Sequence, residues 1–461
     1  MKAADVRVPH ARLWVCAAAV TVGALLLWAT GGYIFYFDEW TFILSTDSSW
    51  THYLQPHNEH PAMIPRLIYT ALLNTVGLRT YVPYMAVLLA LHATNVVLLF
   101  ELVRRRAGDV IGIAAALFLL VLGAGWENLL WAFQIGFVGS VACGLGALLA
   151  LTQGDPPHPR EPRYASLGGP PHTVGRMWLA MVLLFASLMF SGIGLFFWGA
   201  AAVWLALTPA RRHQLVWLAP IPVVFAVWYL AIGHTGGPGT PAQPQSFADW
   251  LATLPLYVVW GVAASLGGLI GEGGELGLVL LLPALAVIGF TWRRRRPDAF
   301  ALGIVAAMIA FYLVLGFNRA QFGYQQSGAG RYVYEGAVFW LLLLADAARN
   351  LPWRGTWRPA LVACAFLVCF SSGATLYAYV IAKSAQMMRQ AADMQALAAE
   401  RTDPCLNPGA AVDPLVMPAV TSARAYYRAI DRYGDPEAGA GPIRNGDFQQ
   451  AVANLRKPGC T

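Results

Sequence analysis

The stretch LWVCAAAVTVGALLLWATGGYIFYFDE, residues 13–39, decides the fold class of this chain. Residues 13–37 carry no charge and exceed the roughly 20 apolar residues that a helix needs to cross a hydrocarbon core. Lys2, Arg7 and Arg12 precede the stretch, as they would in a signal peptide. It is too long for a signal core, however, and no small-residue cleavage site ends it. We therefore predict an uncleaved first membrane span that ends at an acidic pair.

Apolar stretches of the same kind recur as far as about residue 381. Of 461 residues, 57% are hydrophobic and 12% are charged, and the mean hydropathy is +0.53. Soluble domains carry about 25% charged residues. Lipid cannot satisfy unpaired backbone groups, so open sheets are excluded, and the continuous runs lack the alternation of a β-barrel. The fold class predicted is an all-α polytopic membrane protein.

The net charge of +7 is distributed as short basic bursts between the apolar stretches. Such bursts mark cytoplasmic loops, so we interpret them as determinants of topology and expect no nucleic-acid partner. Placing all of them inside puts 18 of the 31 Lys and Arg residues inside and 17 of the 24 Asp and Glu residues outside. The bursts lie at 104–106, 211–212, 293–296 and 349–358.

This threading predicts about 11 transmembrane helices, with the N-terminus cytoplasmic and the C-terminus extracytoplasmic. The block 177–208 is too long for one span and is divided at 191–194. If the apolar stretch 247–270 crossed the membrane, every later loop would move to the opposite side. We therefore expect it to form a helix that lies on the outer face or re-enters from it. The spans are expected at about 12–37, 82–103, 110–125, 136–152, two within 177–208, 215–233, 275–292, 298–316, 333–348 and 358–381.

Two parts are expected. Residues 1–381 form a transmembrane module whose first outer loop covers about 38–81, and residues 382–461 form a small extracytoplasmic tail. Four of the six cysteines lie in apolar spans, whereas Cys405 and Cys460 fall in the tail. Disulfides persist in that compartment, so we predict a Cys405–Cys460 bridge, with two free thiols as the alternative.

The acidic pair Asp38 and Glu39 stands at the outer end of the first span. Partial burial raises the pKa of a carboxylate and makes it a better proton acceptor, which suits a general base. The alternative is that the pair merely ends the span and faces water, with its aromatic neighbours as interfacial anchors.

The first outer loop contains a dense polar group, listed at the end of this paragraph. Its residue types suit a sugar hydroxyl network or a divalent ion, although the spacing is not that of the HExxH zinc motif. Arg66 follows next to an apolar run, where we expect it to face a carboxylate or a phosphate. The polar group comprises His57, Asn58, Glu59 and His60.

Two further outer segments combine polar and aromatic residues. The turn 126–134 carries Glu127 and Gln134 among tryptophans, which is typical both of carbohydrate recognition and of an interfacial belt. Between the ninth and tenth spans, Arg319 and Arg331 flank a Gly- and Gln-rich stretch. Guanidinium groups pair with phosphate oxygens, so a lipid phosphate is a natural ligand. The alternative is an ordinary Arg331–Glu335 helical pair.

Taken together, these features resemble the GT-C superfamily of polyprenyl-phosphate-sugar-dependent glycosyltransferases, in particular its protein O-mannosyltransferase-like and bacterial arabinosyl- or mannosyltransferase-like members. The resemblance rests on Asp38–Glu39, on the loop element Glu59–His60–Pro61, and on Arg331–Tyr332, which is similar to a late arginine-tyrosine element of the family. The chain has no DxD, and Ala62 stands where the family has a second proline.

The resemblance implies a membrane glycosyltransferase that moves a hexose or pentose from a polyprenyl-phosphate donor to an acceptor hydroxyl, with inversion. Asp38 would be the general base and Glu39 its catalytic neighbour. Arg319, Arg331, Tyr332 and Arg66 would bind the donor phosphate. The acceptor, a glycan, lipid or protein, would meet the polar loop residues together with Glu127 and Gln134.

The cofactor and the function class retain alternatives. A divalent cation (Mg²⁺, Mn²⁺ or Ca²⁺) is left open, with Asp38, Glu59 and His60 as its ligands if one binds. The other classes are a flippase or transporter of lipid-linked glycans and a polymerase or ligase of surface polysaccharide. The expected location is a bacterial plasma (inner) membrane, where the partners are membrane lipid, donor and acceptor.

Overall fold

The computed structural model describes residues 2–46, 49–58, 60–152, 171–236, 247–436 and 443–460. Within these residues every regular element is a helix, and β-pairing is limited to isolated bridges. The prediction of an all-α chain is therefore confirmed. Glu59 lies outside the described residues.

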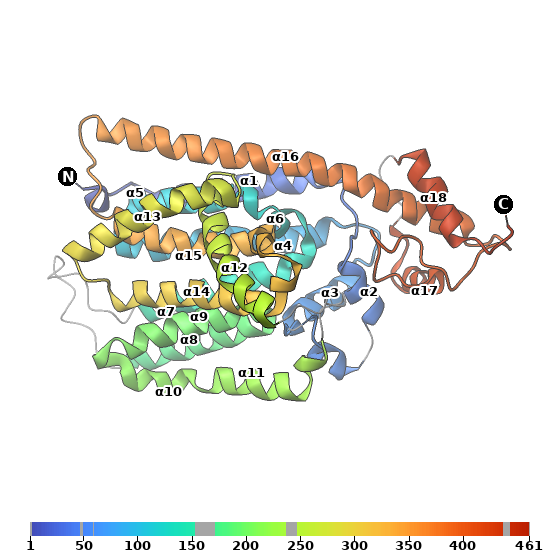
Figure 1. Ribbon diagram of the computed structural model, residues 1–461, viewed down its shortest axis with the longest axis horizontal. Helices are drawn as coiled ribbons and strands as arrows, with labels where there is room; N and C mark the ends of the chain where they lie inside the picture. Colours follow the sequence, from blue (N-terminus) through green and yellow to red (C-terminus); the bar gives the residue numbers. More distant parts are fainter. Residues whose placement is uncertain are drawn as a thin grey trace.

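Mostly apolar helices of 12 to 44 residues form the body of the molecule (Figure 1). They are α1 (Ala11–Ala29), α4 (Val82–Ala107), α5 (Asp109–Leu120), α7 (Ile135–Thr152), α8 (Pro171–Phe190), α9 (Gly194–Ala206), α11 (Pro220–Ala231), α12 (Phe247–Gly268), α13 (Gly274–Arg294), α14 (Ala299–Arg319), α15 (Gly330–Ala348) and α16 (Trp357–Glu400).

Shorter helices and 3₁₀ turns connect the long helices and build the right-hand end of Figure 1. The short α-helices are α2 (Glu39–Ser45), α3 (Met63–Thr75), α6 (Glu127–Leu130), α10 (Leu215–Leu218), α17 (Ala423–Tyr433) and α18 (Asn445–Leu455). The 3₁₀ turns are η1 (Ala3–Asp5), η2 (Trp50–Leu54), η3 (Gly123–Gly125), η4 (Ala132–Gln134), η5 (Pro209–Gln214), η6 (Gly233–Thr235), η7 (Ala320–Phe322) and η8 (Tyr324–Gly328).

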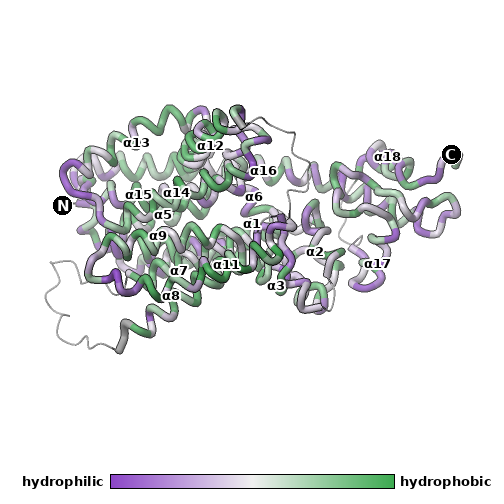
Figure 2. Tube along the Cα trace, turned by 60° about the horizontal axis from the view of Figure 1, so that its bottom comes forward, coloured by the Kyte–Doolittle hydropathy of each residue, from purple (hydrophilic) through white to green (hydrophobic). Residues whose placement is uncertain are grey.

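The helices are long and apolar enough for a multi-pass membrane protein. Among the described residues, eight have the length and composition of a membrane span, and α5, α8 and α9 are shorter apolar helices. Each of the eleven expected spans corresponds to a helix, but α15 belongs to neither of these two sets, and α12, which is one of the eight, is not an expected span. Figure 2 shows hydrophobic residues along the bundle and hydrophilic residues concentrated towards its two ends. That distribution is what lipid around the middle of the bundle requires. The orientation of the ends remains a prediction.

The expected break inside residues 177–208 is present. Helix α8 ends at Phe190 and α9 begins at Gly194. A Cβ atom on Gly194 would come within 2.4 Å of the backbone nitrogen of Leu188, so a larger residue would push the two helices apart. The glycine therefore lets the chain turn back closely on itself.

Helix α12 lies across the ends of its neighbours rather than along them. Its first turn meets Phe317 through Trp250, with ring centroids 4.8 Å apart. Its last residue, Gly268, lies against Val333. Both contacts are at the same end of the bundle, where α14 finishes and α15 starts, and Figure 1 shows α12 running steeply across them. Helix α12 also has the length and composition of a membrane span, so the expectation that 247–270 lies on the outer face or re-enters from it stays a prediction.

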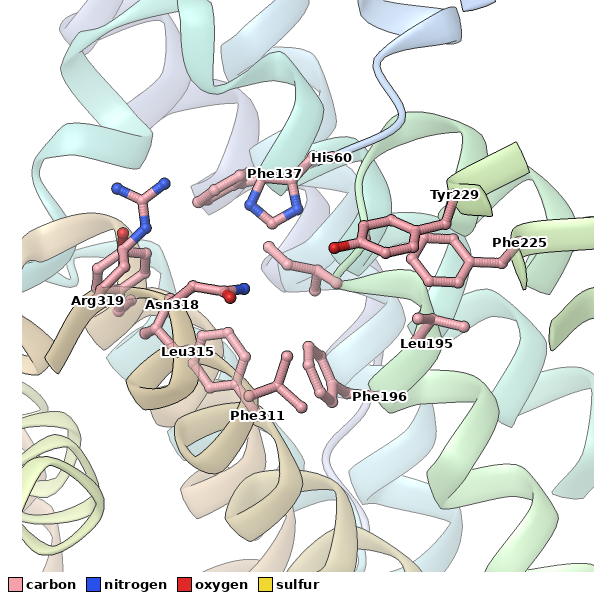
Figure 3. A pocket seen from close by; sticks show the side chains of 14 residues that line it. His60, Phe137, Leu195, Phe196, Phe225, Tyr229, Phe311, Leu315, Asn318 and Arg319 are labelled. Atoms are coloured by element: carbon pink, nitrogen blue, oxygen red, sulfur yellow. The ribbon is translucent and has the colours of Figure 1, made fainter. Parts of the chain in front are cut away.

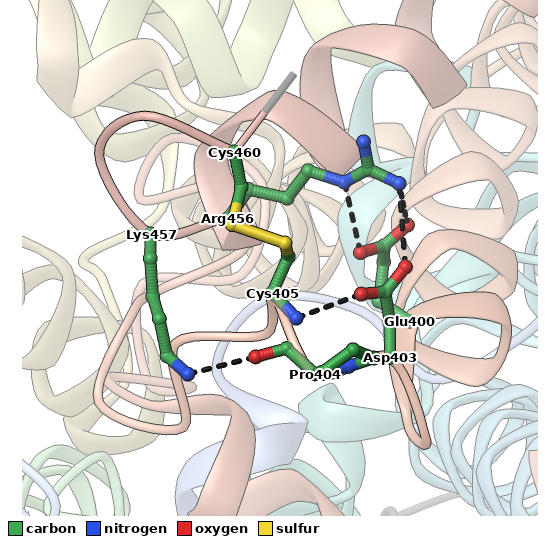
Figure 4. Close-up of a disulfide and its surroundings, with 7 residues drawn as sticks. All are labelled: Glu400, Asp403, Pro404, Cys405, Arg456, Lys457 and Cys460. Carbon is green, nitrogen blue, oxygen red and sulfur yellow. Dashed lines mark hydrogen bonds and ion pairs between the residues drawn. A yellow bond between two sulfur atoms is a disulfide. The ribbon is translucent and has the colours of Figure 1, made fainter.

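Helix α16 continues through the expected boundary at residue 381 as far as Glu400. The tail folds back on it: Arg456 donates two hydrogen bonds to the Glu400 carboxylate, at 3.0 and 3.1 Å. Cys405 and Cys460 form the predicted disulfide beside this ion pair (Figure 4). The bridge thus closes the tail next to its anchor on α16.

The tail also contacts the first outer loop. The rings of Tyr426 and Trp40 are 5.3 Å apart, and the backbone N–H of Leu78 donates to the carbonyl of Tyr433 at 2.9 Å. A Cβ atom on Gly77, whose φ is +72°, would clash with that carbonyl. Glycine therefore permits the close approach of α17. The candidate site lies on the bundle side of this junction.

Candidate functional site

The acidic pair after the first span separates into two environments. Asp38 immediately precedes α2, and its side chain is 24% exposed. Glu39 is the first residue of α2 and is fully buried. A solute that enters from the surface can therefore reach Asp38 but not Glu39.

Glu39 is held by tyrosines. Its Oε1 atom accepts hydrogen bonds from the hydroxyls of Tyr69 at 2.8 Å and Tyr81 at 2.7 Å, and its Oε2 atom accepts from the backbone N–H of Tyr36 at 2.7 Å. Burial raises the pKa of Glu39 to about 7, against the opposing effect of these bonds. This arrangement joins the turn before α2 to α3 and α4. Glu39 thus fixes the backbone next to Asp38 from the buried side of the turn.

Asp38 lies in a mixed electrostatic environment. Burial raises its pKa to about 6, while Arg331 and Arg319 oppose that shift and Glu127 adds to it. Its Oδ2 atom is 3.9 Å from Nε2 of His57. A carboxylate with these properties is ionised near neutral pH and basic enough to accept a proton.

The residue before Asp38 has an unusual backbone. Phe37 has φ of +50°, a left-handed conformation that bulky residues rarely adopt. Its ring packs against Tyr36 and Trp131, with centroids 5.7 and 6.3 Å away. Backbone strain of this kind persists only where the surroundings hold it in place, and it is often found at functional sites.

The two histidines of the outer loop form a tight turn. The backbone groups of His57 and His60 exchange hydrogen bonds of 3.1 and 3.2 Å, and Asn58 between them has φ of +51°. Burial lowers the pKa of His57 to about 3 and that of His60 to about 4, with Arg319 contributing to both. Both rings are therefore neutral at physiological pH, so they can orient a hydroxyl but do not supply a positive charge.

Arg331 is linked to the turn between α5 and α7. Its Nε atom is 3.5 Å from Oε2 of Glu127, and the same oxygen accepts a hydrogen bond from the Arg331 backbone N–H at 2.9 Å. The Arg331–Glu335 helical pair is not formed, because Glu335 instead accepts a hydrogen bond from Asn128 at 3.3 Å. The site therefore brings together residues about 200 positions apart.

Arg66 occupies a different place from the one expected. It is buried, and its guanidinium donates to Oγ of Ser45 at 3.1 Å and to the carbonyl of Pro56 at 3.4 Å, and it lies over the ring of Phe42. Among the described residues no carboxylate lies within ion-pair distance of it. Arg66 thus connects α2 with the loop that carries the histidines. Gln134 is likewise buried, in η4.

A cavity of about 210 Å³ opens beside the histidine turn. Figure 3 shows His60, Asn318 and Arg319 on one side, with Phe225 and Leu195 across from them. Most of the remaining wall is apolar, and Tyr332 completes it. The lining residues are His60, Phe137, Gly192, Ile193, Leu195, Phe196, Phe225, Tyr229, Phe311, Val314, Leu315, Asn318, Arg319 and Tyr332.

Three of the residues that line this cavity, His60, Arg319 and Tyr332, are candidate binding residues from the sequence analysis. Most of the other lining residues were not predicted. Phe137, Phe196 and Phe311 lie in apolar spans, where an aromatic side chain looks the same whether it faces lipid, core or ligand. Lys383 was also missed, and its nitrogen lies 3.3 Å from the centroid of the Tyr36 ring. The signal for it was compositional, because only three of the 31 basic residues are lysines.

The described residues do not assemble a metal centre. Within those ranges, no group of three or more His, Cys, Asp and Glu side chains is placed to hold an ion. Of the three ligands suggested by sequence, Asp38 approaches His57 rather than His60. Glu59 is not among the described residues.

Comparison with known protein families and with curated proteins finds no match. Among solved structures, the fold is similar to an oligosaccharyltransferase from Archaeoglobus fulgidus, which was solved in complex with Zn and sulfate. The TM-score is 0.51 at 13% identity, and the likeness covers 96% of this chain and 61% of that one. This chain thus corresponds to about three fifths of the length of that protein. We conclude that the chain is a multi-pass membrane protein whose fold is similar to that of this archaeal oligosaccharyltransferase.

Proposed function

We propose that this protein is a membrane glycosyltransferase that moves a sugar from a polyprenyl-phosphate donor to an acceptor hydroxyl on the extracytoplasmic face. The observation that carries the proposal is the position of Asp38. The positive charges of Arg331 and Arg319 both act to lower the pKa of its partly exposed carboxylate, and Arg319 also lines an apolar cavity. A ligand with an apolar chain and an anionic head matches a cavity with an apolar wall and a cation at one side.

In the proposed reaction, the acceptor oxygen attacks the anomeric carbon of the donor and transfers its proton to the Asp38 carboxylate. The bond between that carbon and the phosphate oxygen breaks, and its electron pair leaves with the phosphate. One displacement inverts the anomeric centre. The transition state has oxocarbenium character. The phosphate gains negative charge as it leaves, and positioned cations stabilise that charge.

The remaining site residues divide by position. Arg319, Arg331 and Tyr332 are proposed to hold the donor phosphate, because two of them line the cavity and the third lies next to Tyr332. Arg66 is proposed to act indirectly, by fixing the loop. The groups proposed to orient sugar or acceptor are His57, Asn58, His60 and Glu127, with Glu59 and Gln134 as further candidates.

The fold likeness supports the reaction class, because the neighbour is named an oligosaccharyltransferase. We extend that likeness to a lipid-linked donor and to a glycan, lipid or protein acceptor. A bacterial plasma membrane is the proposed location.

A divalent cation is not given a step in this mechanism. The neighbouring structure contains Zn, whereas the described residues of this chain include no group of three or more His, Cys, Asp or Glu side chains placed to hold an ion. The chemistry of the displacement also works without a Lewis acid, since the two arginines carry positive charge next to the base.

The test is the Asp38→Asn variant, assayed with purified protein, a polyprenyl-phosphate sugar and a panel of acceptors. Removal of a general base lowers the rate by about 10²–10⁴-fold. The amide is nearly the same size, so the melting temperature should not fall. Asp346→Asn, at the opposite end of the bundle, is the matched control and should retain the wild-type rate.

Retained turnover in Asp38→Asn would remove the assignment. A transporter or flippase would instead move lipid-linked sugar across liposome membranes without forming a glycosidic bond. Mass spectrometry of lipid that co-purifies with the protein identifies the donor chain directly.

A further inference from the structure

Lys383 is a buried lysine in an unusual setting. It lies on α16, is 4% exposed, and its Nζ atom is 3.3 Å from the centroid of the Tyr36 ring. Trp126 and Trp131 lie farther away, with centroids 5.8 and 5.7 Å from the same nitrogen. Three aromatic faces thus surround the ammonium group, and the electron-rich faces attract the cation.

We call the Lys383 ammonium and the rings of Tyr36, Trp126 and Trp131 the cage. Besides the contact between the ammonium and its ring, Tyr36 is held through its hydroxyl. Nζ of Lys383 donates a hydrogen bond to Oε1 of Gln386 at 3.1 Å, and Nε2 of Gln386 donates to the hydroxyl of Tyr36 at 2.6 Å. One turn earlier on α16, the carbonyl of Val380 accepts from the hydroxyl of Tyr33 at 3.0 Å. One face of α16 therefore contacts the segment 33–36 that leads into Asp38.

Charge pairing does not explain why this lysine is buried. Among the described residues, no carboxylate lies within 4 Å of its nitrogen, and Glu39 and Glu127 act on it only at longer range. Burying an ammonium is costly unless something compensates, and burial lowers the pKa of Lys383 to about 7, against the opposing effect of Glu39 and Glu127. The other two lysines of the chain, Lys2 and Lys457, are exposed.

The segment that Lys383 contacts leads directly into Phe37, the residue with the strained backbone before Asp38. Phe37 has φ of +50° and lies between Tyr36 and Asp38. On its other side, Trp131 continues the aromatic packing to Phe133, whose ring is 4.8 Å from that of His57. Ring contacts thus connect Tyr36 with Phe37, which precedes Asp38, and Trp131, by way of Phe133, with His57, which lies 3.9 Å from the Asp38 carboxylate.

We propose that Lys383 is a positioning residue: its ammonium, held over Tyr36, fixes the strained Phe37 turn and so aims the Asp38 carboxylate. This role rests on the proposed transferase function. It also makes α16 more than a membrane span, since the same helix carries the tail that docks on the first outer loop.

The primary test is Lys383→Met, which keeps an unbranched side chain of similar length and removes the charge. A misplaced base is expected to lower kcat by about 10–100-fold with little change in KM for the donor. Release of the turn also lets water reach Asp38, so the acidic limb of the pH–rate profile should move below pH 6, the pKa that burial gives Asp38. The charged or titratable groups that face Asp38 are His57, Glu127, Arg319 and Arg331.

Two variants separate positioning from general stability. Lys383→Arg keeps a cation over the ring and should restore most of the rate. Lys457→Met removes an exposed lysine of the tail and should behave as wild type. A Lys383→Met enzyme with wild-type kcat and an unmoved acidic limb would overturn the proposal.

A thermal double-mutant cycle tests the cage without any assay of transfer. Lys383→Met should lower the melting temperature in the wild-type background but much less in a Tyr36→Leu background, because the ring is then absent. Equal shifts in both backgrounds would refute the cage even if the protein is an active transferase. If wild-type protein transfers no sugar, the proposed function fails, and this cycle still decides whether Lys383 holds Tyr36.

Discussion

The two ends of the helix bundle use charge in opposite ways. We call the end with α4–α5 and α13–α14 junctions the arginine end, and the end with Asp38 and the cavity the site end; they lie at the left and centre-right of Figure 1. At the arginine end, Nε of Arg12 is 2.6 Å from Oε1 of Glu101, and Arg106 pairs with Asp298. These two arginines are neutralised by close partners within the chain.

At the site end, pairing is looser. Among the described residues, the single ion-pair contact of Asp38 is His57, at 3.9 Å, and that ring is neutral. Arg331 is 3.5 Å from Glu127. Paired charges stabilise and orient the chain, whereas partly buried charges with incomplete pairing remain able to bind a ligand or move a proton. This difference separates the end proposed to carry the function from the arginine end.

The largest expected effect among the arginines is that of Arg331→Gln. Loss of a positive charge beside the leaving phosphate should lower kcat/KM by about 10–100-fold. Wild-type activity should rise with pH through about 6, because Asp38 must be ionised to accept a proton. Arg331 lowers the pKa of Asp38, so the variant's acidic limb should move to higher pH.

The matched control for that variant is Arg79→Gln. Arg79 is an exposed arginine of the first outer loop and takes no part in the cavity. A pH–rate profile of Arg331→Gln that coincides with wild type would show that the two ends do not differ as proposed.

Glu39→Gln should affect stability more than chemistry. The amide cannot accept both tyrosine hydroxyls and the Tyr36 N–H together, which leaves a buried polar group unpaired at about 1–3 kcal/mol. The folded protein holds the Glu39 proton more tightly than the unfolded chain, since burial raises the pKa from 4.5 to about 7. That contribution to stability is present below pH 4.5 and is lost as pH rises through 7.

Thermal unfolding across pH 4.5–7 measures this contribution, and Glu272→Gln, at an exposed glutamate, is the control. A Glu39→Gln protein that is as stable as wild type with the same pH slope would contradict a supporting role. If its kcat alone collapsed, Glu39 would belong with Asp38 among the catalytic groups.

The smallest effect on activity is expected for Glu101→Gln at the arginine end. It removes the partner of Arg12 and Arg104 and should cost about 1 kcal/mol of stability. Because the site end is distant, transfer should stay within about twofold of wild type. Loss of transfer in a protein that melts normally would mean that the arginine end also serves the reaction.

The sequence alone determined the all-α membrane class, the positions of the apolar helices, the break at 191–194, the disulfide, and the place of Asp38 after the first apolar helix. These follow from local patterns, because lipid imposes an apolar length on each crossing and a break or burst of charge on each turn.

Only the tertiary structure decided which side chains meet. It separated Glu39 from Asp38, paired Arg331 with Glu127 rather than Glu335, turned Arg66 towards Ser45, and brought Lys383 back over Tyr36. Such contacts join residues up to about 350 positions apart, and they depend on how helices pack rather than on any pattern along one helix. The acidic pair that ends the first span is therefore readable from the sequence, but the different roles of its two members are not.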